Sequence, residues 1–158
     1  MSAPAAKLPT LRCSLVAPAT AVVGQPLPMR LTLHNTGRQT VQVLTWGTPF
    51  EGWLSPFVTV QQGGQALAYG GASLKRGEPD ADEYLAIAPG RSRQAVVDLA
   101  EVFDLGQPGH LQVLPRIVLH DWLAGAPVGA PLPRPRALHQ SAVLDCNSID
   151  VTLQPRKR

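Results

Sequence analysis

The sequence predicts an all-β protein, an immunoglobulin-like antiparallel β-sandwich of seven to nine strands. Pro and Gly make up 30 of the 158 residues, as expected where many turns join short strands. Stretches that alternate apolar and polar residues recur between these turns, and no window of about 12 residues keeps a helical period. A small open barrel is the second architecture that fits such a pattern.

The N-terminal part of the chain predicts three strands. Residues 11–15 alternate Leu, Cys and Leu with Arg and Ser, which is typical of a half-buried strand. Residues 29–34 repeat this alternation, and Asn-Thr-Gly at 35–37 forms a turn. The third strand begins at 41–44. These segments predict a strand-turn-strand unit early in the fold.

The middle of the chain predicts a hairpin and a longer strand. Residues 57–60 and 65–69 are joined by Gln-Gln-Gly-Gly, whose glycines supply the positive φ angles of a tight turn. Residues 70–82 have the composition of a loop. A Pro-Gly turn at 89–90 precedes the strand predicted over 92–99.

The C-terminal part predicts one helical turn, two strands and a long Pro-rich loop. The helical turn falls at 100–105, and a strand follows over 110–119. Pro115 interrupts that strand, so we expect it at a sheet edge or in a bulge. Residues 124–137 are rich in Pro and should run as an extended, polyproline-like excursion. The last strand is predicted over 148–153.

Length and charge indicate one domain. We expect a flexible N-terminus at 1–9, a single β-sandwich over 10–154 and a basic tail at 155–158. The formal net charge is +3. The tail is too small a patch to predict nucleic-acid binding. No apolar run approaches the roughly 18 residues of a membrane span. The protein is expected to be a monomer.

The two cysteines, Cys13 and Cys146, lie in the predicted first strand and just before the last one. First and last strands are often neighbours in a sandwich, so a disulfide is expected; two buried free thiols are the alternative. A disulfide would place the protein in the periplasm or outside the cell. The N-terminal residues lack the apolar core of a signal peptide, so a cytoplasmic location stays open.

The segment from Trp46 to Trp53 concentrates two indoles, a Phe, a Pro and a carboxylate in eight residues. Such a loop either closes one end of the sandwich or presents a recognition surface. We expect Trp46 to be the buried plug, with Phe50 and Trp53 at least partly exposed as anchors for a protein partner. The partner-binding residues predicted here and in the neighbouring basic segment are Phe50, Glu51, Trp53, Lys75 and Arg76.

Catalytic, metal and cofactor sites find no support in the sequence. The four histidines have no ligand spacing, and neighbouring residues of a strand such as His120 and Asp121 point to opposite faces. A nucleophile elbow and a phosphate-binding loop are also missing. The acidic segment 78–83 could hold Ca²⁺, but a solvated acidic turn beside Lys75 and Arg76 fits it better. We therefore predict a protein that is not an enzyme and has no cofactor.

The order of several motifs resembles a known protein family. The motifs are Asn-Thr-Gly at 35–37, Trp-Gly-Thr-Pro-x-Glu-Gly at 46–52, Leu-Lys-Arg-Gly-Glu-Pro at 74–79, Asp-Glu-Tyr at 82–84, Ile-Ala-Pro-Gly at 87–90, Val-Asp-Leu at 97–99, Phe-Asp-Leu at 103–105 and Pro-Gly at 108–109. Together they resemble the non-catalytic N-terminal β-sandwich domain of bacterial relatives of peptidyl-Lys and deuterolysin-type zinc metalloendopeptidases.

This resemblance implies an accessory or propeptide-like module without catalytic residues. The His-Glu-x-x-His motif that binds zinc in such proteases does not occur in the chain, and the insertion at 123–145 has no counterpart. We therefore expect a non-enzymatic, protein-binding module associated with a protease, with a metalloprotease as the candidate partner. Alternatives are a purely structural domain of a larger secreted protein and a small standalone proteinase inhibitor.

Overall fold

The computed structural model describes residues 6–7, 10–125 and 132–157, and within these ranges the chain is all-β. The only helices in the described part are the 3-10 turns η1 (Pro49–Glu51), η2 (Ala81–Glu83), η3 (Leu99–Glu101) and η4 (Arg136–Leu138). None of these is long and apolar enough to cross a membrane. The strands are β1 (Ala6–Lys7), β2 (Leu11–Val16), β3 (Thr20–Val22), β4 (Pro28–Asn35), β5 (Val41–Leu44), β6 (Val58–Gln62), β7 (Gln65–Ala66), β8 (Tyr84–Ile87), β9 (Ser92–Asp98), β10 (Gly109–Pro115), β11 (Val118–Leu119), β12 (Trp122–Ala124), β13 (Ala142–Val143) and β14 (Ile149–Gln154).

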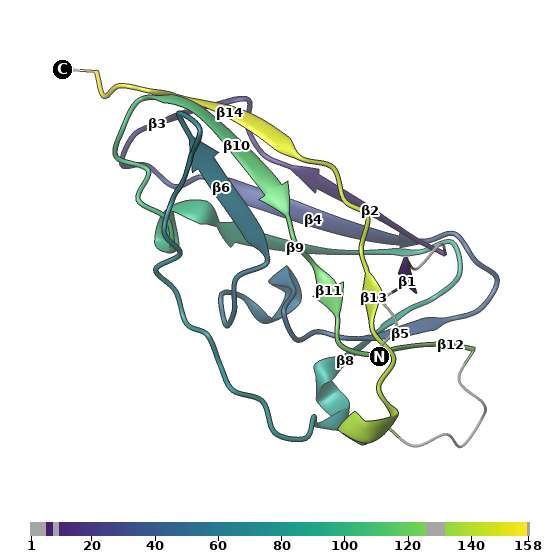
Figure 1. Ribbon diagram of the computed structural model, residues 1–158. Coiled ribbons are helices and arrows are strands. Elements are labelled where there is room, and N and C mark those ends of the chain that lie inside the picture. The colour runs from purple at the N-terminus through teal and green to yellow at the C-terminus, as the bar shows by residue number, and fades with distance from the viewer. Residues whose placement is uncertain (1–5, 8–9, 126–131, 158) are drawn as a thin grey trace.

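Two main sheets face each other, as the prediction of an immunoglobulin-like sandwich requires. One has the strand order β3-β14-β10-β6-β7 and the other β2-β4-β9. In Figure 1 the layer of β14, β10 and β6 lies over the layer of β4 and β9. Two small sheets, β12-β5-β8 and β1-β13-β11, extend the sandwich at one end. Most pairs are antiparallel, while the short strands β1 and β3 pair in parallel with β13 and β14.

The core lies between the main sheets because their strands alternate buried and exposed residues. In β2 and β14 every second residue is buried, starting with Leu11 and Ile149. On β4, Met29, Leu31 and Leu33 are completely buried. Each such side chain stabilises the fold by roughly 1.5–3 kcal/mol relative to an exposed one. The period-two pattern of the sequence therefore selects the inward face of each strand.

The prediction of seven to nine strands agrees with the longer strands of the structure. The strands of four or more residues in the described ranges are β2, β4, β5, β6, β8, β9, β10 and β14. Gly63 and Gly64 have φ angles of 60° and 78° at the tip of the β6–β7 hairpin, as expected for its turn. Of the predicted Pro-rich excursion, residues 126–131 lie outside the described residues. Residues 1–5 and 8–9 of the predicted flexible N-terminus also lie outside the described residues.

The expectation that Pro115 marks an edge strand or bulge is wrong. β10 lies in the middle of its sheet, between β14 and β6, and Pro115 is its last residue. Arg116 N donates to Phe57 O (2.8 Å), so the alternation of the ladder turns the nitrogen of Pro115 toward the β14 side. There β14 begins only at Ile149, opposite Val113. The missing N–H of proline therefore removes no ladder hydrogen bond.

The predicted disulfide is present, but the strand arrangement expected for it is not. Cys13 and Cys146 are bonded, with their Cα atoms 4.8 Å apart. The first long strand, β2, pairs only with β4, whereas the last strand, β14, belongs to the opposite sheet. Cys146 lies in the connection between β13 and β14, and this connection reaches β2. The disulfide therefore ties β2 to the chain that enters the other sheet.

Candidate functional site

The loop from Trp46 to Trp53 is a compact turn built around the side chain of Thr48. Thr48 is fully buried; its Oγ1 donates to Thr45 O (2.7 Å) and accepts from Phe50 N (3.2 Å). This cap starts η1, with Pro49 at its first position. Gly52 ends the turn with a φ of 75°, a conformation that other residues rarely adopt. The loop is thus shaped by its own sequence.

Glu51 joins this loop to the basic segment that follows. Its Oε1 accepts from Gly47 N (2.9 Å) and forms an ion pair with Nη2 of Arg76. Only 9% of the Glu51 side chain and 16% of the Arg76 side chain are exposed. Nη1 of Arg76 also lies 3.8 Å from Glu83 Oε2. Both charges are therefore held inside the molecule rather than presented to solvent.

Trp53 packs against the end of β9. Its ring stacks on Phe57 with centroids 4.3 Å apart, and its Nε1 donates to Asp98 O (3.0 Å). Leu99 N donates a hydrogen bond to Leu27 O on the β4 side, so the carbonyl of the neighbouring Asp98 faces away from β4. On that side no further strand of the described chain pairs with β9. The loop therefore packs against the end of β9 and occupies one carbonyl of its open edge.

Trp46 is the buried plug that the sequence predicts, with 2% of its surface exposed. Its Nε1 donates to Glu83 Oε2 (2.7 Å). The guanidinium groups of Arg76 and Arg136 lie 5.1 Å and 5.8 Å from its ring, within the range of cation–π attraction. Two imidazoles, His120 and His139, meet the ring edge-on. The indole thus organises a charged cluster at this end of the molecule.

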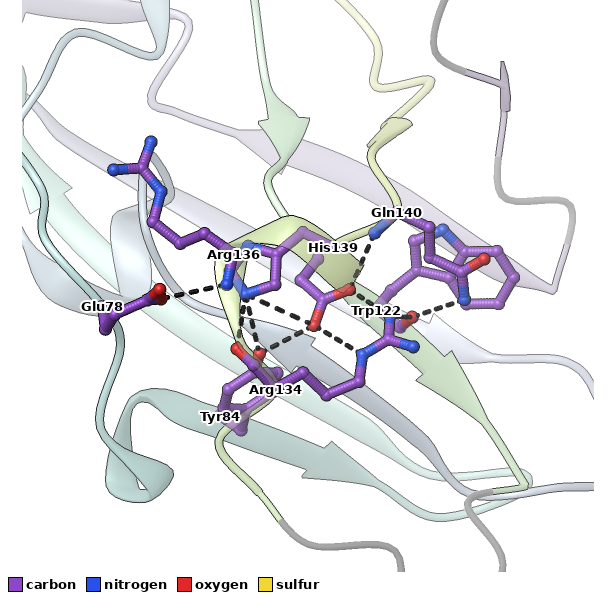
Figure 2. A network of polar contacts seen from close by, with 8 residues as sticks. Glu78, Tyr84, Trp122, Arg134, Arg136, His139 and Gln140 are labelled. Atoms are coloured by element: carbon purple, nitrogen blue, oxygen red, sulfur yellow. Dashed lines mark hydrogen bonds and ion pairs between the residues drawn. The ribbon is translucent and has the colours of Figure 1, made fainter.

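Asp121 is the centre of a second polar network, drawn in Figure 2. It is completely buried, and its carboxylate accepts hydrogen bonds from Tyr84 OH (2.7 Å), Gln140 N (3.0 Å) and Arg134 Nε (3.0 Å). Nε of Arg134 binds Asp121 Oδ2 and its Nη2 binds Oδ1, so the guanidinium contact is bidentate. Arg134 Nη2 also donates to Trp122 O (3.2 Å). Asp121 thereby fastens the described end of the Pro-rich insertion to β8 and β12.

The electrostatics of this network favour a structural role. Burial alone would raise the pKa of Asp121, but the hydrogen bonds from Arg134, Tyr84 and the Gln140 N–H outweigh it and lower the pKa below the usual aspartate value. Burial, followed by the hydrogen bond and the charge of Asp121, raises the pKa of Tyr84 far above its ordinary value. A carboxylate that already accepts these hydrogen bonds is a poor general base.

His120 is exposed and Asp121 is buried, and both lie in the connection between β11 and β12 rather than in a strand as the sequence predicted. Partial loss of hydration and the nearby guanidinium groups of Arg136 and Arg76 lower the pKa of His120. The two residues therefore do not form an oriented acid-base pair.

Arg136 connects the insertion to the basic segment after the aromatic loop. Its N–H donates to Glu78 Oε2 (2.9 Å), and its Nη1 donates to Arg76 O (2.7 Å). We call these two adjacent segments, residues 74–78 and 134–138, the seam. Leu74 and Leu138, one in each segment, are large apolar side chains with 49% and 62% of their surfaces exposed. The seam is thus an ordered surface with charged and apolar side chains.

The residues predicted to bind a partner come together in this region but differ in accessibility. Phe50 and Trp53 are half-buried and pack against the core, while Glu51 and Arg76 bind each other. Lys75 is exposed. In the acidic segment, Asp80 N donates to Glu83 Oε1 (2.9 Å), forming a capping box. Within the described residues no group of three or more His, Cys, Asp and Glu could hold a metal ion.

Sequence reasoning missed the Asp121 network. Its members come from β8, from the start of β12 and from the insertion, so their separation along the chain gave no pattern. One sequence feature could have predicted the network: Asp121 falls in the alternating pattern at a position expected to face inward, and the Pro-rich segment that follows contains Arg134 and Arg136. A buried carboxylate requires a partner of this kind.

Comparison with known proteins links the chain to a protease. No protein-family model matches the chain. Over 107 residues, 66% of the chain, it is 30% identical to an extracellular protease of Aeromonas hydrophila. The matched stretch covers 31% of that protein, so the chain corresponds to about a third of its relative's length.

Similarity to solved structures is low. The CARDB domain of a Pyrococcus furiosus protein overlaps with 93% of the chain and 94% of that domain, at 10% identity and a TM-score of 0.37. A β-glucosidase from Listeria innocua overlaps with 91% of the chain but 16% of the enzyme, at 13% identity and a TM-score of 0.36. Overlaps of this size support no inference about function.

Proposed function

We propose that this protein is a non-enzymatic, protein-binding module that acts together with an extracellular protease, as an accessory, propeptide-like or inhibitory domain. The observation that carries the proposal is the 30% identity over 107 residues to part of the Aeromonas hydrophila extracellular protease. The buried Asp121 and Glu51 pairs support it, since both carboxylates serve to hold loops in place. The partner would be a protein, with a metalloprotease as the candidate.

The contact surface of this proposal is centred on Phe50, Glu51, Trp53, Lys75 and Arg76. Glu51 and Arg76 position the loop through their ion pair, so the direct contacts fall to the exposed groups around them. Lys75 supplies an exposed charge, and Leu74 and Leu138 supply exposed apolar surface along the seam. Apolar side chains at the centre of a contact and charges at its rim are typical of protein interfaces.

A purely structural domain is the second candidate function, and a specific observation favours it. The indole of Trp53 stacks on Phe57 and bonds Asp98 O, so it is used inside the sandwich. If the loop serves only to close the fold, exposed seam residues should tolerate substitution without any effect on binding. The two readings therefore differ in the behaviour of Lys75 and the seam leucines.

The disulfide and the protease relative together support an oxidising compartment, the periplasm or the cell exterior. We expect the natural protein to be isolated with Cys13 and Cys146 bonded. Mass spectrometry of protein alkylated before reduction measures this directly. Two alkylated cysteines in protein taken from its native compartment would contradict the proposed location.

Binding to the purified Aeromonas hydrophila extracellular protease tests the function. We expect saturable binding by calorimetry, weakened at least about tenfold by the double change Lys75→Glu and Leu138→Ser. Lys157→Glu, a change of the same charge in the exposed tail, is the matched control and should bind normally. Equal affinity of all three proteins would remove the seam as the contact surface, and no binding at all would favour the structural candidate.

The protein itself is expected to hydrolyse no protein substrate. Casein incubated with the purified chain alone should stay intact, while protease activity measured in its presence should change if the module inhibits or assists. Cleavage of casein by the chain alone would contradict the non-enzymatic assignment if the activity persists in all seam variants.

A further inference from the structure

Strand β6 loses its outer partner halfway along its length. β7 pairs with Gln61 and Gln62, and the last bond between the two segments runs from Leu67 N to Val60 O (2.8 Å). Beyond this point the chain turns away from β6, and Gly70 N donates instead to Val102 O (2.7 Å). The edge of β6 beside Val58 is therefore left without a neighbouring strand in the described part of the chain.

The backbone of Val58 faces this gap. Arg116 N donates to Phe57 O on the β10 side, and bonded positions alternate along an antiparallel ladder. Phe57 and Thr59 thus pair toward β10, while Val58 and Val60 face outward. Val60 is satisfied by Leu67. Neither the N–H nor the C=O of Val58 has a hydrogen-bond partner among the described residues. Val58 keeps only 4% of its surface exposed, and it lines the pocket described next, so an added chain would reach these groups through that pocket.

A pocket of about 310 Å³ lies beside this edge. Val58, Leu67, Tyr69 and Phe103 contribute apolar lining, and Arg116 contributes a guanidinium group. Tyr69 is held in place because its OH donates to Ala72 O (2.6 Å) and its ring packs against Phe103 at 6.0 Å. The apolar wall is thus formed before any ligand arrives, which reduces the entropy lost on binding.

Arg116 is exposed, and it forms no ion pair with another residue of the described ranges, in contrast to Arg76 and Arg134. A guanidinium group binds a carboxylate through two parallel hydrogen bonds. The pocket therefore combines three features: a free strand edge, an apolar wall and a carboxylate receptor.

We propose that this pocket binds the C-terminal residue of an extended peptide chain. The peptide backbone pairs with the N–H and C=O of Val58, the last side chain fits between Leu67, Tyr69 and Phe103, and the terminal carboxylate binds Arg116. Strand addition combined with capture of a chain end is an established mode of peptide recognition. The volume is near the lower end of the roughly 300–1,000 Å³ of ligand pockets, which suits one apolar side chain.

The proposal is independent of the seam and of any protease partner. It is tested with labelled hexapeptides that end in Leu, prepared as the free acid and as the C-terminal amide, by fluorescence polarisation. The free acid should bind at least about tenfold more tightly than the amide, since only the acid can pair with Arg116. Arg116→Gln should weaken the free acid to the level of the amide and leave the melting temperature unchanged.

Arg12→Gln is the matched control, because Arg12 is an exposed arginine on β2, outside the pocket lining, and this variant should bind as the wild type does. N-acetyl-leucine shares the carboxylate and the side chain but cannot extend the strand, and it should bind at least about tenfold more weakly than the hexapeptide. Equal affinity for acid and amide, equal affinity for N-acetyl-leucine, or no binding of the free acid at about 1 mM would each overturn the proposal. If the protein does not bind the extracellular protease but does bind the peptide, the result counts against the seam as a contact surface and not against this pocket.

Discussion

The side-chain amide of Asn147 takes the place of a strand beside Leu15. Its Oδ1 accepts from Leu15 N (2.8 Å), and its Nδ2 donates to Leu15 O (2.9 Å). The two residues are 132 positions apart in the chain. Leu15 lies on the outer edge of β2, where no strand of the described chain pairs. Together with the neighbouring disulfide at Cys146, Asn147 closes this edge.

Replacing Asn147 by Ala should lower the free energy of unfolding by about 1–2 kcal/mol, since it removes the partners of both backbone groups of a buried residue. Urea denaturation measures the change. Asn147→Asp keeps an acceptor but loses the donor, so its loss should be smaller. Ser148→Ala, an exposed neighbour, serves as the control. Equal stability of Asn147→Ala and the control would show that the amide contributes nothing.

Reduction of the disulfide should destabilise the protein strongly. The bond closes a loop with a sequence separation of 133, for which chain entropy predicts roughly 4–5 kcal/mol, although measured values are often smaller. We expect the double variant Cys13→Ser and Cys146→Ser to unfold at a clearly lower temperature in a calorimetric scan. Dithiothreitol should lower the melting temperature of the wild type but not that of the variant. A wild type insensitive to reductant would contradict this prediction.

Trp53→Ala should behave as a core truncation. The ring stacks on Phe57 and packs with Tyr69 and Phe103, so its removal should cost about 3–5 kcal/mol of folding free energy. In a thermal scan this corresponds to a decrease of roughly 10 °C. Trp53→Phe retains the stack and loses only the hydrogen bond to Asp98 O, so its decrease should be smaller. Unchanged stability of Trp53→Ala would instead favour a role as a partner anchor.

The ion pair between Arg134 and Asp121 should make stability depend on acid pH. Because the pKa of Asp121 is lower in the folded protein than in the unfolded chain, its contribution is complete above the unfolded value of about 3.9 and is lost as the pH falls through the folded pKa. Arg134→Met, which leaves a buried charge without its main partner, should cost about 3 kcal/mol at pH 7.

The difference in unfolding free energy between the wild type and Arg134→Met should shrink below about pH 4. In this range Asp121 becomes protonated first in the variant and then in the wild type. Urea midpoints of both proteins at pH 7, 4 and 2.5 measure this. Arg156→Met, an exposed arginine near the C-terminus, is the control for general charge effects. A cost of Arg134→Met that stays constant over this range would exclude Asp121 as the titrating group.

The sequence by itself determined the inward faces of the strands and the tight turn at Gly63 and Gly64. These features follow from local rules: an alternation of period two selects one face, and glycine permits positive φ angles. The disulfide between Cys13 and Cys146 was also predicted, but the strands that it joins were not predicted correctly. Local rules determine which residues point inward, but they do not determine which strands become neighbours.

Only the tertiary structure decided which groups meet. Asp121 finds Arg134 across the insertion, Glu51 finds Arg76, and Asn147 lies beside Leu15, each over a separation that leaves no periodic trace in the sequence. Trp53 was expected to be at least partly exposed as an anchor; it is half-buried, and its indole donates a hydrogen bond to Asp98 O at the end of β9, a partner that the sequence did not indicate. The physical reason is that buried charges and open strand edges must be satisfied, and the partner is whichever group the packing of the two sheets brings within reach.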